Sequence, residues 1–529
     1  MVIVHWLHTA PHVAFEPPPT ASRHLEISVL NLAVHPVDLG IVVAYVCGIV
    51  MLGIWVGRGQ RDLNSYLLGS RDLPWWAILG SIVATETSTV TFLSVPGITF
   101  AEGGDLRFLQ LAMGLIAGRI VVALVLLPQY FRGQMFTAYE VLAKRFGGAT
   151  KQTASALFLV TRNLGDGLRL FLTAIVMEKV VGFDLATSIV LIGIATIVYT
   201  FFGGMKAVVW NDCIQLVAYL GGALLACQII GQRVPGGWGE IARFAETTGR
   251  LRLFDFSWSW ESKDTFWAGL IGGAFLTLGT HGTDQMMVQR YLSARRQRDA
   301  GKAIVASGLV VLMQFTLFLL LGIGLACFYA RVAPGARFDR GDEVLATFIV
   351  TQLPVGATGV TLAAVFSAAM STLSSSLHSS ASAAVNDLYR PTLRKPPKPG
   401  HLLRVSRLMT VAFGVIQILV GIGASYVSRS VINDALAIAG FAAGILLGIF
   451  ALGVLTTRVG QSAAMVGVLA GVAMLSWLKF ATQVAWPWYA VLGSLTVFAT
   501  GYLVSLLIQT RNPILDDLQN SSPTNLDHE

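Results

Sequence analysis

Residues 370–376 read Met-Ser-Thr-Leu-Ser-Ser-Ser, in the middle of an apolar segment, 360–385, that is long enough to cross a bilayer. The hydroxyl side chains at 371, 372, 374 and 375 gather on one side of a helix, because their spacing is i, i+1, i+3 and i+4. A helix that faces only lipid has no use for so many hydroxyls. Two interpretations are open: the hydroxyls bind a small, hard cation, which takes oxygen ligands, or they form a seam of small residues where helices pack closely.

The composition of the whole chain indicates its class. Of its 529 residues, 54% are hydrophobic and only 12% are charged, whereas a soluble globular protein has about 25% charged residues. Apolar runs recur almost from end to end, each close to the roughly 20 residues that cross a bilayer as a helix. We therefore predict an all-α polytopic membrane protein. A barrel is excluded because barrel strands show short alternating segments rather than continuous apolar runs.

Hydropathy along the chain predicts about thirteen membrane-spanning helices. They occupy approximately 38–57, 74–99, 107–131, 152–181, 183–202, 207–232, 266–292, 302–331, 356–388, 401–427, 431–457, 461–480 and 487–509. A short amphipathic segment, 342–353, precedes the ninth span. We expect an extracytoplasmic tail at 1–37, a membrane domain at 38–510 and a polar cytoplasmic tail at 511–529.

Basic residues follow the first, third, seventh and ninth spans, so they occupy alternate loops on one side of the membrane. The four groups are Arg58, Arg61 and Arg71; Arg132, Lys144, Arg145 and Lys151; Arg290, Arg295, Arg296, Arg298 and Lys302; and Arg390, Arg394, Lys395, Lys398, Arg404 and Arg407. The positive-inside rule then places the N-terminus outside and the C-terminus in the cytoplasm of a plasma (inner) membrane. The net charge of +8 is a topology signal, and we expect no nucleic-acid partner.

The N-terminal segment contains His5, His8 and His12, which we interpret as part of a solvated tail rather than a metal site. It has no basic region before an apolar core and does not resemble a cleaved signal peptide. The four cysteines all fall inside predicted spans and suggest no disulfide framework: Cys47, Cys213, Cys227 and Cys327.

Two predicted spans are interrupted by polar residues at corresponding positions. The second contains 84–89, Ala-Thr-Glu-Thr-Ser-Thr, and the seventh contains 279–285, Gly-Thr-His-Gly-Thr-Asp-Gln. They lie five spans apart, so each would open one of two five-helix halves, and because five is odd the halves have opposite orientations. Broken helices at matching positions of an inverted repeat indicate a binding site near the membrane midplane. Unwound backbone is tolerated there only where it lines a cavity or is buried in protein.

Several motifs are shared with a known family and occur in the family's order between about residues 38 and 510. They are 139–147, YEVLAKRFG; 202–215, FGGMKAVVWNDCIQ; 284–292, DQMMVQRYL; 370–375, MSTLSS, with 386–389, NDLY; and 444–453, GILLGIFALG. On these motifs the chain resembles the sodium:solute symporter family, which includes sodium/glucose, sodium/proline and sodium/sialic-acid transporters. The resemblance implies a leucine-transporter-like core: a first helix at 38–57, inverted repeats at 74–232 and 266–457, and two further helices at 461–509.

The resemblance also implies a main sodium site between the broken second span and the ninth. By match with the family, the ligands would be the carbonyl oxygens of Ala84, Thr87 and Ala368 and the hydroxyls of Ser371 and Thr372. Five neutral oxygens suit Na⁺, which is hard and needs no strongly anionic cage.

Some family members bind a second sodium, and by match its ligands here would be Asp212, Ser374 and Ser375, with Ser371 shared. A nearby cation gives a physical reason for a carboxylate inside a span. Asp212 could instead be a helix N-terminal acid that the helix dipole stabilises, and serines this close together also serve packing. We expect two Na⁺ per solute molecule.

Three ionisable residues lie on one face of the fourth span, at i, i+4 and i+7: Arg162, Asp166 and Arg169. We interpret Arg162 and Asp166 as an internal ion pair, which leaves Arg169 without an obvious partner. A planar guanidinium is a natural clamp for a carboxylate. Arg169 is therefore a candidate to bind the carboxylate of a solute.

Three further residues are candidates for contact with the solute. Glu86 belongs to the first break, where it could receive an ammonium or hydroxyl, carry a proton, or remain protonated in the core. Asp284 lies in the second break and could hold hydroxyls or an amine, and Gln285 beside it is a weaker candidate. Arg119, in the third span, is a buried charge whose partner the sequence does not identify.

No enzyme motif is present: the chain has no phosphate-binding loop, nucleophile elbow or cluster of zinc ligands. We therefore expect a secondary active transporter that couples Na⁺ to a small organic solute by alternating access, in contact with membrane lipid and without a cofactor. The hydroxyl cluster and Asp212 argue against an uncoupled channel or facilitator. A sensor that keeps the transporter fold generally adds a cytoplasmic regulatory domain, for which the 511–529 tail is too short. The solute could be a sugar, an amino acid, a sugar acid or a monocarboxylate, and an Arg169 without a partner favours the classes that bear a carboxylate.

Overall fold

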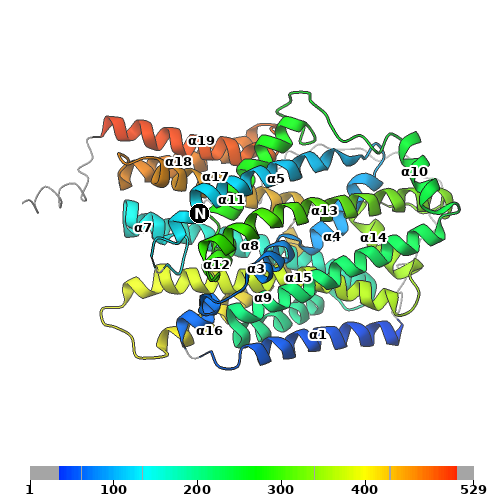
Figure 1. Cartoon of the computed structure of the whole chain (residues 1–529), viewed down its shortest axis with the longest axis horizontal. Coiled ribbons are helices and arrows are strands. Elements are labelled where there is room, and N and C mark those ends of the chain that lie inside the picture. The colour runs from blue at the N-terminus through cyan, green and yellow to red at the C-terminus, as the bar shows by residue number, and fades with distance from the viewer. Residues whose placement is uncertain (1–34, 61, 134, 339, 428–430, 509–529) are drawn as a thin grey trace, which may run out of the picture.

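The structure is a computed structural model that describes residues 35–508, apart from positions 61, 134, 339 and 428–430. Figure 1 shows a bundle whose helices run mostly along the longest dimension of the molecule. Within the described residues, nine helices are long and apolar enough to cross a membrane, and a bent helix pair raises the number to ten. The predicted tails, 1–37 and 511–529, lie outside the described residues except for positions 35–37.

Most of the predicted spans coincide with single helices. These are α1 (Pro36–Val56), α8 (Gly148–Val181), α13 (Gln297–Arg331), α15 (Ala357–Ala383), α16 (His401–Val427), α17 (Val431–Leu455), α18 (Gln461–Ala481) and α19 (Pro487–Leu507). The third span is composite and consists of a 3-10 turn, α5 (Leu109–Val121), a π-helical segment and α6 (Leu127–Tyr130). The amphipathic segment forms α14 (Gly341–Gln352). The total of thirteen stays a prediction.

Two predicted spans, 183–202 and 207–232, lie on either side of one glycine. The helical stretch α9 (Leu185–Arg233) is interrupted at Gly204, which has φ 52° and ψ −159°. Glycine adopts a positive φ without steric penalty. A side chain here would also collide with the neighbouring chain, because a Cβ on Gly204 would lie 2.7 Å from the carbonyl oxygen of Tyr66. The turn between the two spans therefore depends on this residue.

Both predicted helix breaks are present. The first separates α3 (Trp75–Glu86) from α4 (Thr89–Phe100), and the two helices are bent by 61°. Thr87 ends α3 in an extended conformation, in a run of β-branched and hydroxyl residues that favour helices weakly. The second separates α11 (Gly273–Gly282) from α12 (Gln285–Leu292), where the Asp284 carboxylate accepts a hydrogen bond from the Met286 amide at 2.8 Å. The prediction of two interrupted spans is confirmed.

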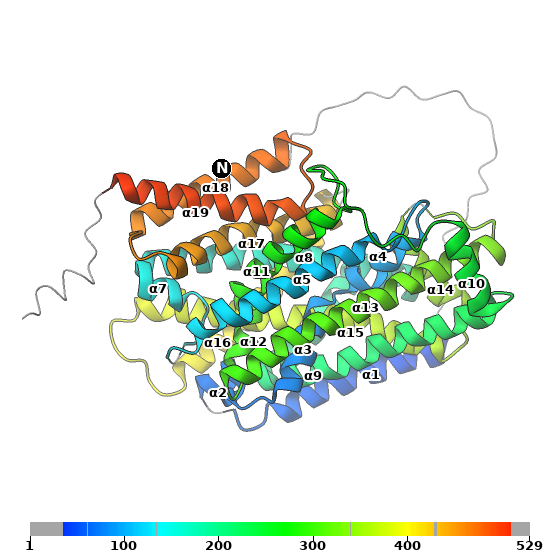
Figure 2. The ribbon, with the colours of Figure 1, turned by 45° about the horizontal axis from the view of Figure 1, so that its top comes forward.

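Helix α15 is buried along almost its whole length, where it packs against α9, α8, α1 and α16. Its serines therefore face other helices and not lipid. Short helices close the two ends of the bundle in Figure 1: α10 (Gly237–Thr247) lies beside α14 at one end, and α7 (Glu140–Phe146) lies at the other. Figure 2 shows α18 and α19 side by side at one edge, against α17. The two breaks and α15 thus meet inside the bundle, away from this edge.

Candidate functional site

Hydroxyls of α15 meet the backbone of α3 directly before its break. Ser371 Oγ donates to the carbonyl oxygen of Ala84 at 2.9 Å and lies 3.3 Å from that of Ala368, one turn earlier in its own helix. Thr372 Oγ1 donates to the carbonyl of Thr85 at 3.0 Å. Four of the five predicted sodium ligands therefore come together: Ala84, Ala368, Ser371 and Thr372. Neutral oxygens converging in a buried place fit a Na⁺ ion, which takes oxygen ligands.

The fifth predicted ligand, Thr87, caps α3 at the break. Its hydroxyl accepts a hydrogen bond from the amide of Gln314 on α13. Its side chain is therefore engaged on the α13 side, while Ala84, one turn earlier, faces α15. The predicted role of Thr87 concerned its carbonyl oxygen, so this contact leaves that prediction untested.

The residues predicted for a second sodium surround an arginine. Asp212 on α9 is fully buried and accepts hydrogen bonds from Ser81 Oγ at 2.5 Å and from Arg290 Nη2 at 3.2 Å. Ser375 Oγ also accepts from Arg290. Ser374 Oγ donates to the carbonyl of Ser371 within its own helix at 3.2 Å. A positive charge is thus present beside Asp212, and it belongs to the protein.

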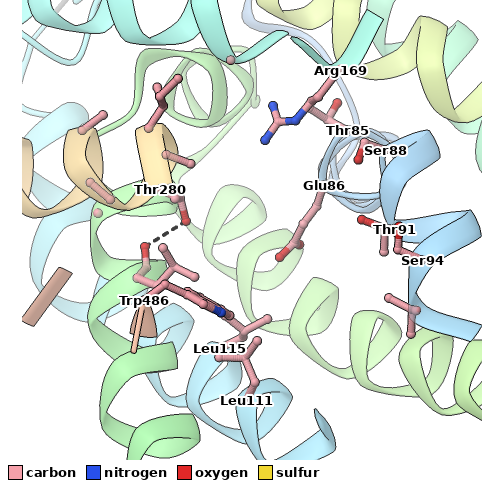
Figure 3. A pocket seen from close by; sticks show the side chains of 18 of the residues that line it. Thr85, Glu86, Ser88, Thr91, Ser94, Leu111, Leu115, Arg169, Thr280 and Trp486 are labelled. Atoms are coloured by element: carbon pink, nitrogen blue, oxygen red, sulfur yellow. Dashed lines mark hydrogen bonds between the residues drawn. The ribbon is translucent and has the colours of Figure 1, made fainter. Parts of the chain in front are cut away.

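A cavity of about 780 Å³ lies beside the first break. Its wall combines charged and aromatic side chains, among them Glu86, Asp284, Arg162, Arg169, Phe108, Phe158, Phe315 and Trp486. Figure 3 shows Glu86 and Arg169 extending into the opening, with Leu111, Leu115 and Trp486 along one side. Residues 85 and 86, at the end of α3, and residue 88, in the break, line this cavity. The end of α3 therefore contributes both to the cavity wall and, through Ala84, to the cluster of oxygens.

Ion pairs between helices hold the charges of the cavity wall. Arg119, which is completely buried, pairs with Glu86, and His281 Nε2 lies 3.6 Å from the same carboxylate. Glu86 belongs to α3, Arg119 to α5 and His281 to α11. The partner of Arg119, which the sequence left unidentified, is therefore the predicted solute residue Glu86. The side chain of Glu86 is 19% exposed and still borders the cavity.

Arg169 does not lack a partner, and this prediction is wrong. Its Nη1 pairs with Asp166, one turn before it on α8. The predicted pair between Arg162 and Asp166 is present at 3.6 Å, but Arg162 also pairs with Asp284 of the second break. The spacing along α8 identified contacts within that helix alone. Arg162 also pairs with Asp284 of another helix, and Asp166 pairs with both Arg162 and Arg169.

Gln285, the weaker candidate for a solute contact, is in contact with a loop and is not among the residues that line the cavity. Its side chain is fully buried, accepts a hydrogen bond from the Ala138 amide at 2.7 Å and donates one to the Phe136 carbonyl at 3.1 Å. These bonds join α12 to the segment before α7. Asp284 remains at the cavity wall, where it holds Arg162.

The end of the bundle opposite α10 is closed by a second buried carboxylate. Asp387, after α15, accepts hydrogen bonds from Thr137 at 2.7 Å and Ser155 at 2.8 Å and forms an ion pair with Lys151 at 3.3 Å. The sequence showed Asp387 only as part of a motif. Lys151, which the charge pattern counted as a loop residue, lies at the start of α8.

Arg290 was also counted as a loop residue, and the structure corrects this placement. It lies in α12 with only 1% of its side chain exposed. The charge pattern could not distinguish Arg290 from the basic residues that follow, because it lies near the end of a predicted span and only five residues before Arg295. The signal available in the sequence was its distance of six residues from Asp284, which places it within the helix after the break.

A family model described as the sodium:solute symporter family matches residues 66–471. The chain belongs to the sodium:solute symporter family. The sodium/sialic acid symporter NanT of Aliivibrio fischeri is 29% identical over 486 residues, which cover 91% of this chain and 95% of NanT. Human sodium-coupled monocarboxylate transporter 1 is 28% identical over 440 residues, which cover 82% of this chain and 71% of that protein.

A solved structure of a Na⁺-coupled sialic acid symporter in a substrate-bound outward-open state, reported to have a novel Na⁺ site, resembles this symporter with a TM-score of 0.83. It is 26% identical and covers 90% of this chain and 98% of that one. The predicted leucine-transporter-like fold is therefore confirmed. This symporter is an integral membrane transporter coupled to Na⁺, and not an enzyme.

Proposed function

We propose that this symporter carries a solute bearing a carboxylate group together with Na⁺ across the plasma membrane. The observation that carries the proposal is the position of Arg169 at the cavity wall. Among the residues that the structure describes, only Nη1 is paired, with Asp166, and 23% of the side chain is exposed. The rest of the guanidinium extends into the opening (Figure 3). Its unused N–H groups suit the two oxygens of a carboxylate, which a guanidinium binds in a bidentate manner.

The opposite charges of the wall support a solute that also carries polar groups. Glu86 borders the cavity between its partners Arg119 and His281, so an ammonium or hydroxyl group of the solute can reach an acceptor there. Leu111, Leu115 and Trp486 provide an apolar face for the carbon skeleton. Relatives named for sialic acid and for monocarboxylates transport solutes of this chemical class. Amino acids, sugar acids and monocarboxylates fit this description.

Sodium would bind at the oxygens of Ala84, Ala368, Ser371 and Thr372, with the carbonyl of Thr87 as the fifth ligand. The Ser371 hydroxyl lies 2.9 Å from the Ala84 carbonyl oxygen and 3.3 Å from that of Ala368, and the Thr372 hydroxyl lies 3.5 Å from that of Ala368. Because residues of the same break line the cavity, a sodium ion that orders this break also orders part of the solute site. Binding of Na⁺ before the solute would then raise the affinity for the solute, which is the basis of coupling.

The cavity would open to the outside, with the N-terminus outside and the C-terminus in the cytoplasm. Its wall includes Lys263 and Asp264 of the long loop that the charge pattern assigns to the outer face. The network around Asp387 closes the opposite end. These features are those of an outward-facing state in the alternating-access cycle.

A panel of solutes tests the proposal, because a bound ligand raises the melting temperature of the purified protein by mass action. We expect N-acetylneuraminate, pyruvate or an amino acid to stabilise the protein in Na⁺ but not in choline, and glucose to have no effect. Stabilisation by glucose alone would contradict the proposal.

Replacement of Arg169 by lysine then tests the clamp. Lysine keeps the charge but loses the planar fork, so Arg169→Lys should weaken binding of the stabilising solute about tenfold, which corresponds to about 1.4 kcal/mol. Its effect on Na⁺ binding should stay within about twofold. Arg107→Lys is the matched control, because Arg107 lines the same cavity, has the same exposed fraction of 23% and is held by two carboxylates. Equal solute binding by Arg169→Lys and the wild type would contradict the clamp.

A further inference from the structure

A short loop lies buried at the end of the bundle that the charge pattern assigns to the cytoplasm. It consists of residues 135–139, between α6 and α7, and we call it the plug. Four of its five residues are no more than 2% exposed: Met135, Thr137, Ala138 and Tyr139. Most loops lie on the surface, because buried backbone N–H and C=O groups need hydrogen-bond partners. The partners of the plug therefore show what keeps this end closed.

Gln285 of α12 supplies two of these partners. Its Oε1 accepts a hydrogen bond from the amide of Ala138 at 2.7 Å, and its Nε2 donates one to the carbonyl of Phe136 at 3.1 Å. Within the described residues, neither of these two backbone groups has another hydrogen bond. In an opened end, water would satisfy the same amide and carbonyl, so the two bonds stabilise the closed plug alone.

The residue before Gln285 belongs to the cavity wall. Asp284 lines the cavity, pairs with Arg162 of α8 and caps the start of α12 by accepting a hydrogen bond from the amide of Met286. Two successive residues thus contact the cavity and the plug. The second helix break lies directly before them, so a shift of this end of α12 does not require α11 to bend.

We propose that Gln285 is a positioning residue that couples the solute cavity to the plug. A solute that contacts Asp284 or its partner Arg162 shifts the start of α12, and Gln285 then withdraws both bonds from the plug at once. Binding of the solute therefore favours opening toward the cytoplasm, whereas Na⁺ alone leaves the plug closed. This inference rests on the proposed function, because it needs a solute at the cavity wall.

Labelling of a cysteine in the plug of the purified full-length protein tests the inference. Ala138→Cys places a small thiol at a buried position, which a maleimide reaches only when the plug opens. The solute is N-acetylneuraminate, or pyruvate if the thermal-shift panel selects it. In Na⁺, addition of the solute should speed labelling about tenfold. The protein without Ala138→Cys measures labelling of the native cysteines.

Replacement of Gln285 on this background should remove the dependence on solute. Gln285→Met keeps an unbranched side chain but loses both bonds, which shifts the equilibrium toward the open plug by about tenfold or more. Its labelling without solute should therefore be as fast as that of Ala138→Cys with solute. Gln285→Glu keeps the acceptor for the Ala138 amide but not the donor for Phe136, and it should label at an intermediate rate.

Gln289→Met is the matched control, because Gln289 lies one turn later on α12, is 1% exposed and donates to the carbonyl of Leu67 at 2.7 Å, away from the plug. Its labelling should still depend on the solute. A general loosening of α12 would instead speed labelling in Gln289→Met as much as in Gln285→Met, and this result would contradict a specific role of Gln285.

Two further results would overturn the inference. The first is equal labelling of Ala138→Cys with and without solute, which decides the question even if no Gln285 variant folds. The second is a dependence on solute in Gln285→Met that equals that of Ala138→Cys alone, in a variant that keeps the thermal shift with solute. If no solute of the panel stabilises the wild type, the proposed function itself fails, and the premise of this inference fails with it.

Discussion

Ser371 and Thr372 supply the only side-chain oxygens of the proposed sodium site, so single substitutions test it. Ser371→Ala and Thr372→Ala should each raise the Na⁺ concentration for half-maximal uptake about tenfold, since a hydrogen bond or ligand contact to a charged group is worth about 1.5–3 kcal/mol. Expression should change little. The measurement is sodium-dependent solute uptake in vesicles.

The matched control is Ser379→Ala, because Ser379 lies on the same helix, is equally buried and donates only to the carbonyl of Ser376 in that helix at 3.1 Å. Its sodium dependence should equal that of the wild type. A sodium dependence unaltered in both Ser371→Ala and Thr372→Ala would refute the site.

The pair of Glu86 and Arg119 predicts a loss of stability. Arg119 is fully buried, and its Nε and Nη1 have no hydrogen-bond partner within the described residues. Glu86→Gln would leave the positive charge of Arg119 uncompensated. It should therefore lower the free energy of unfolding by about 3–5 kcal/mol. Arg119→Met with Glu86→Gln should recover part of this loss. Denaturant unfolding of the wild type, Glu86→Gln, Arg119→Met and the double variant measures the coupling between the two side chains. If the losses in unfolding free energy of the two single variants simply add up in the double variant, the pair does not interact.

Residue types and spacings predicted the hydroxyl cluster, the burial of Asp212 and the ion pair of Arg162 with Asp166. They did not predict which charge each arginine meets. Arg162 reaches Asp284, Arg119 reaches Glu86 and Arg290 reaches Asp212 across helices that are far apart in sequence. Spacing along a helix identifies neighbours on that helix only. It did not show that Arg162 also pairs with Asp284 of another helix, and so Asp166 was assigned to Arg162 alone although it also pairs with Arg169.

At the scale of elements, the bonds of Asp387 tie the end of α15 to α8 and to the segment before α7. Opening of this end to the cytoplasm requires these contacts to separate. Lys151→Met removes the ion pair and should favour the inward-facing state, so apparent Na⁺ affinity should fall roughly three- to tenfold, because Na⁺ favours the outward-facing state. Sodium titration of solute uptake measures the change.

Lys144→Met is the control for this variant, because Lys144 is a nearby basic residue whose only described bond is to the carbonyl of Arg132 in an exposed setting. It should leave apparent Na⁺ affinity unchanged. If the apparent Na⁺ affinity of Lys151→Met equals that of the wild type, the contacts of Asp387 do not keep this end of the bundle closed.

The positions of both helix breaks were predictable from sequence because polar, β-branched residues and glycine interrupt apolar runs at 84–89 and 279–285. Helix α10 was not predicted, since it lies in a loop with no apolar run of membrane length. The sequence predicted two spans separated near Gly204. It did not predict that Gly204 alone would depart from helical geometry within one otherwise continuous helical stretch.

At the scale of the whole molecule, the charge pattern predicts which face is outside. Thr248 lies after α10, and Lys398 lies in the loop between α15 and α16; both are exposed. In right-side-out vesicles, Thr248→Cys should react with a membrane-impermeant maleimide, and Lys398→Cys should react only after permeabilisation. The opposite pattern of labelling would reverse the orientation. The native protein is the control for labelling of its own cysteines.

The class, family and core of this molecule were predictable because apolar runs and ordered motifs extend over most of the chain. The thirteen predicted spans exceed the ten of apolar membrane length within the described residues, because α8 carries charges inside the bundle, α11 and α12 are short, and α9 holds two predicted spans in one helical stretch. Charged and short helices such as α8, α11 and α12 satisfy their polar groups in the protein interior. Apolar length alone therefore does not identify them as membrane spans.

The central claim is that a solute is driven by the sodium gradient through the site at Ser371. Uptake of the stabilising carboxylate solute into proteoliposomes tests it most directly. With Na⁺ outside and K⁺ inside, the wild type should accumulate the solute above its external concentration, and collapse of the sodium gradient should release it. Ser371→Ala should accumulate it only at a much higher Na⁺ concentration. Uptake that merely equilibrates the solute, at the same rate in Na⁺ and in choline, would contradict the claim.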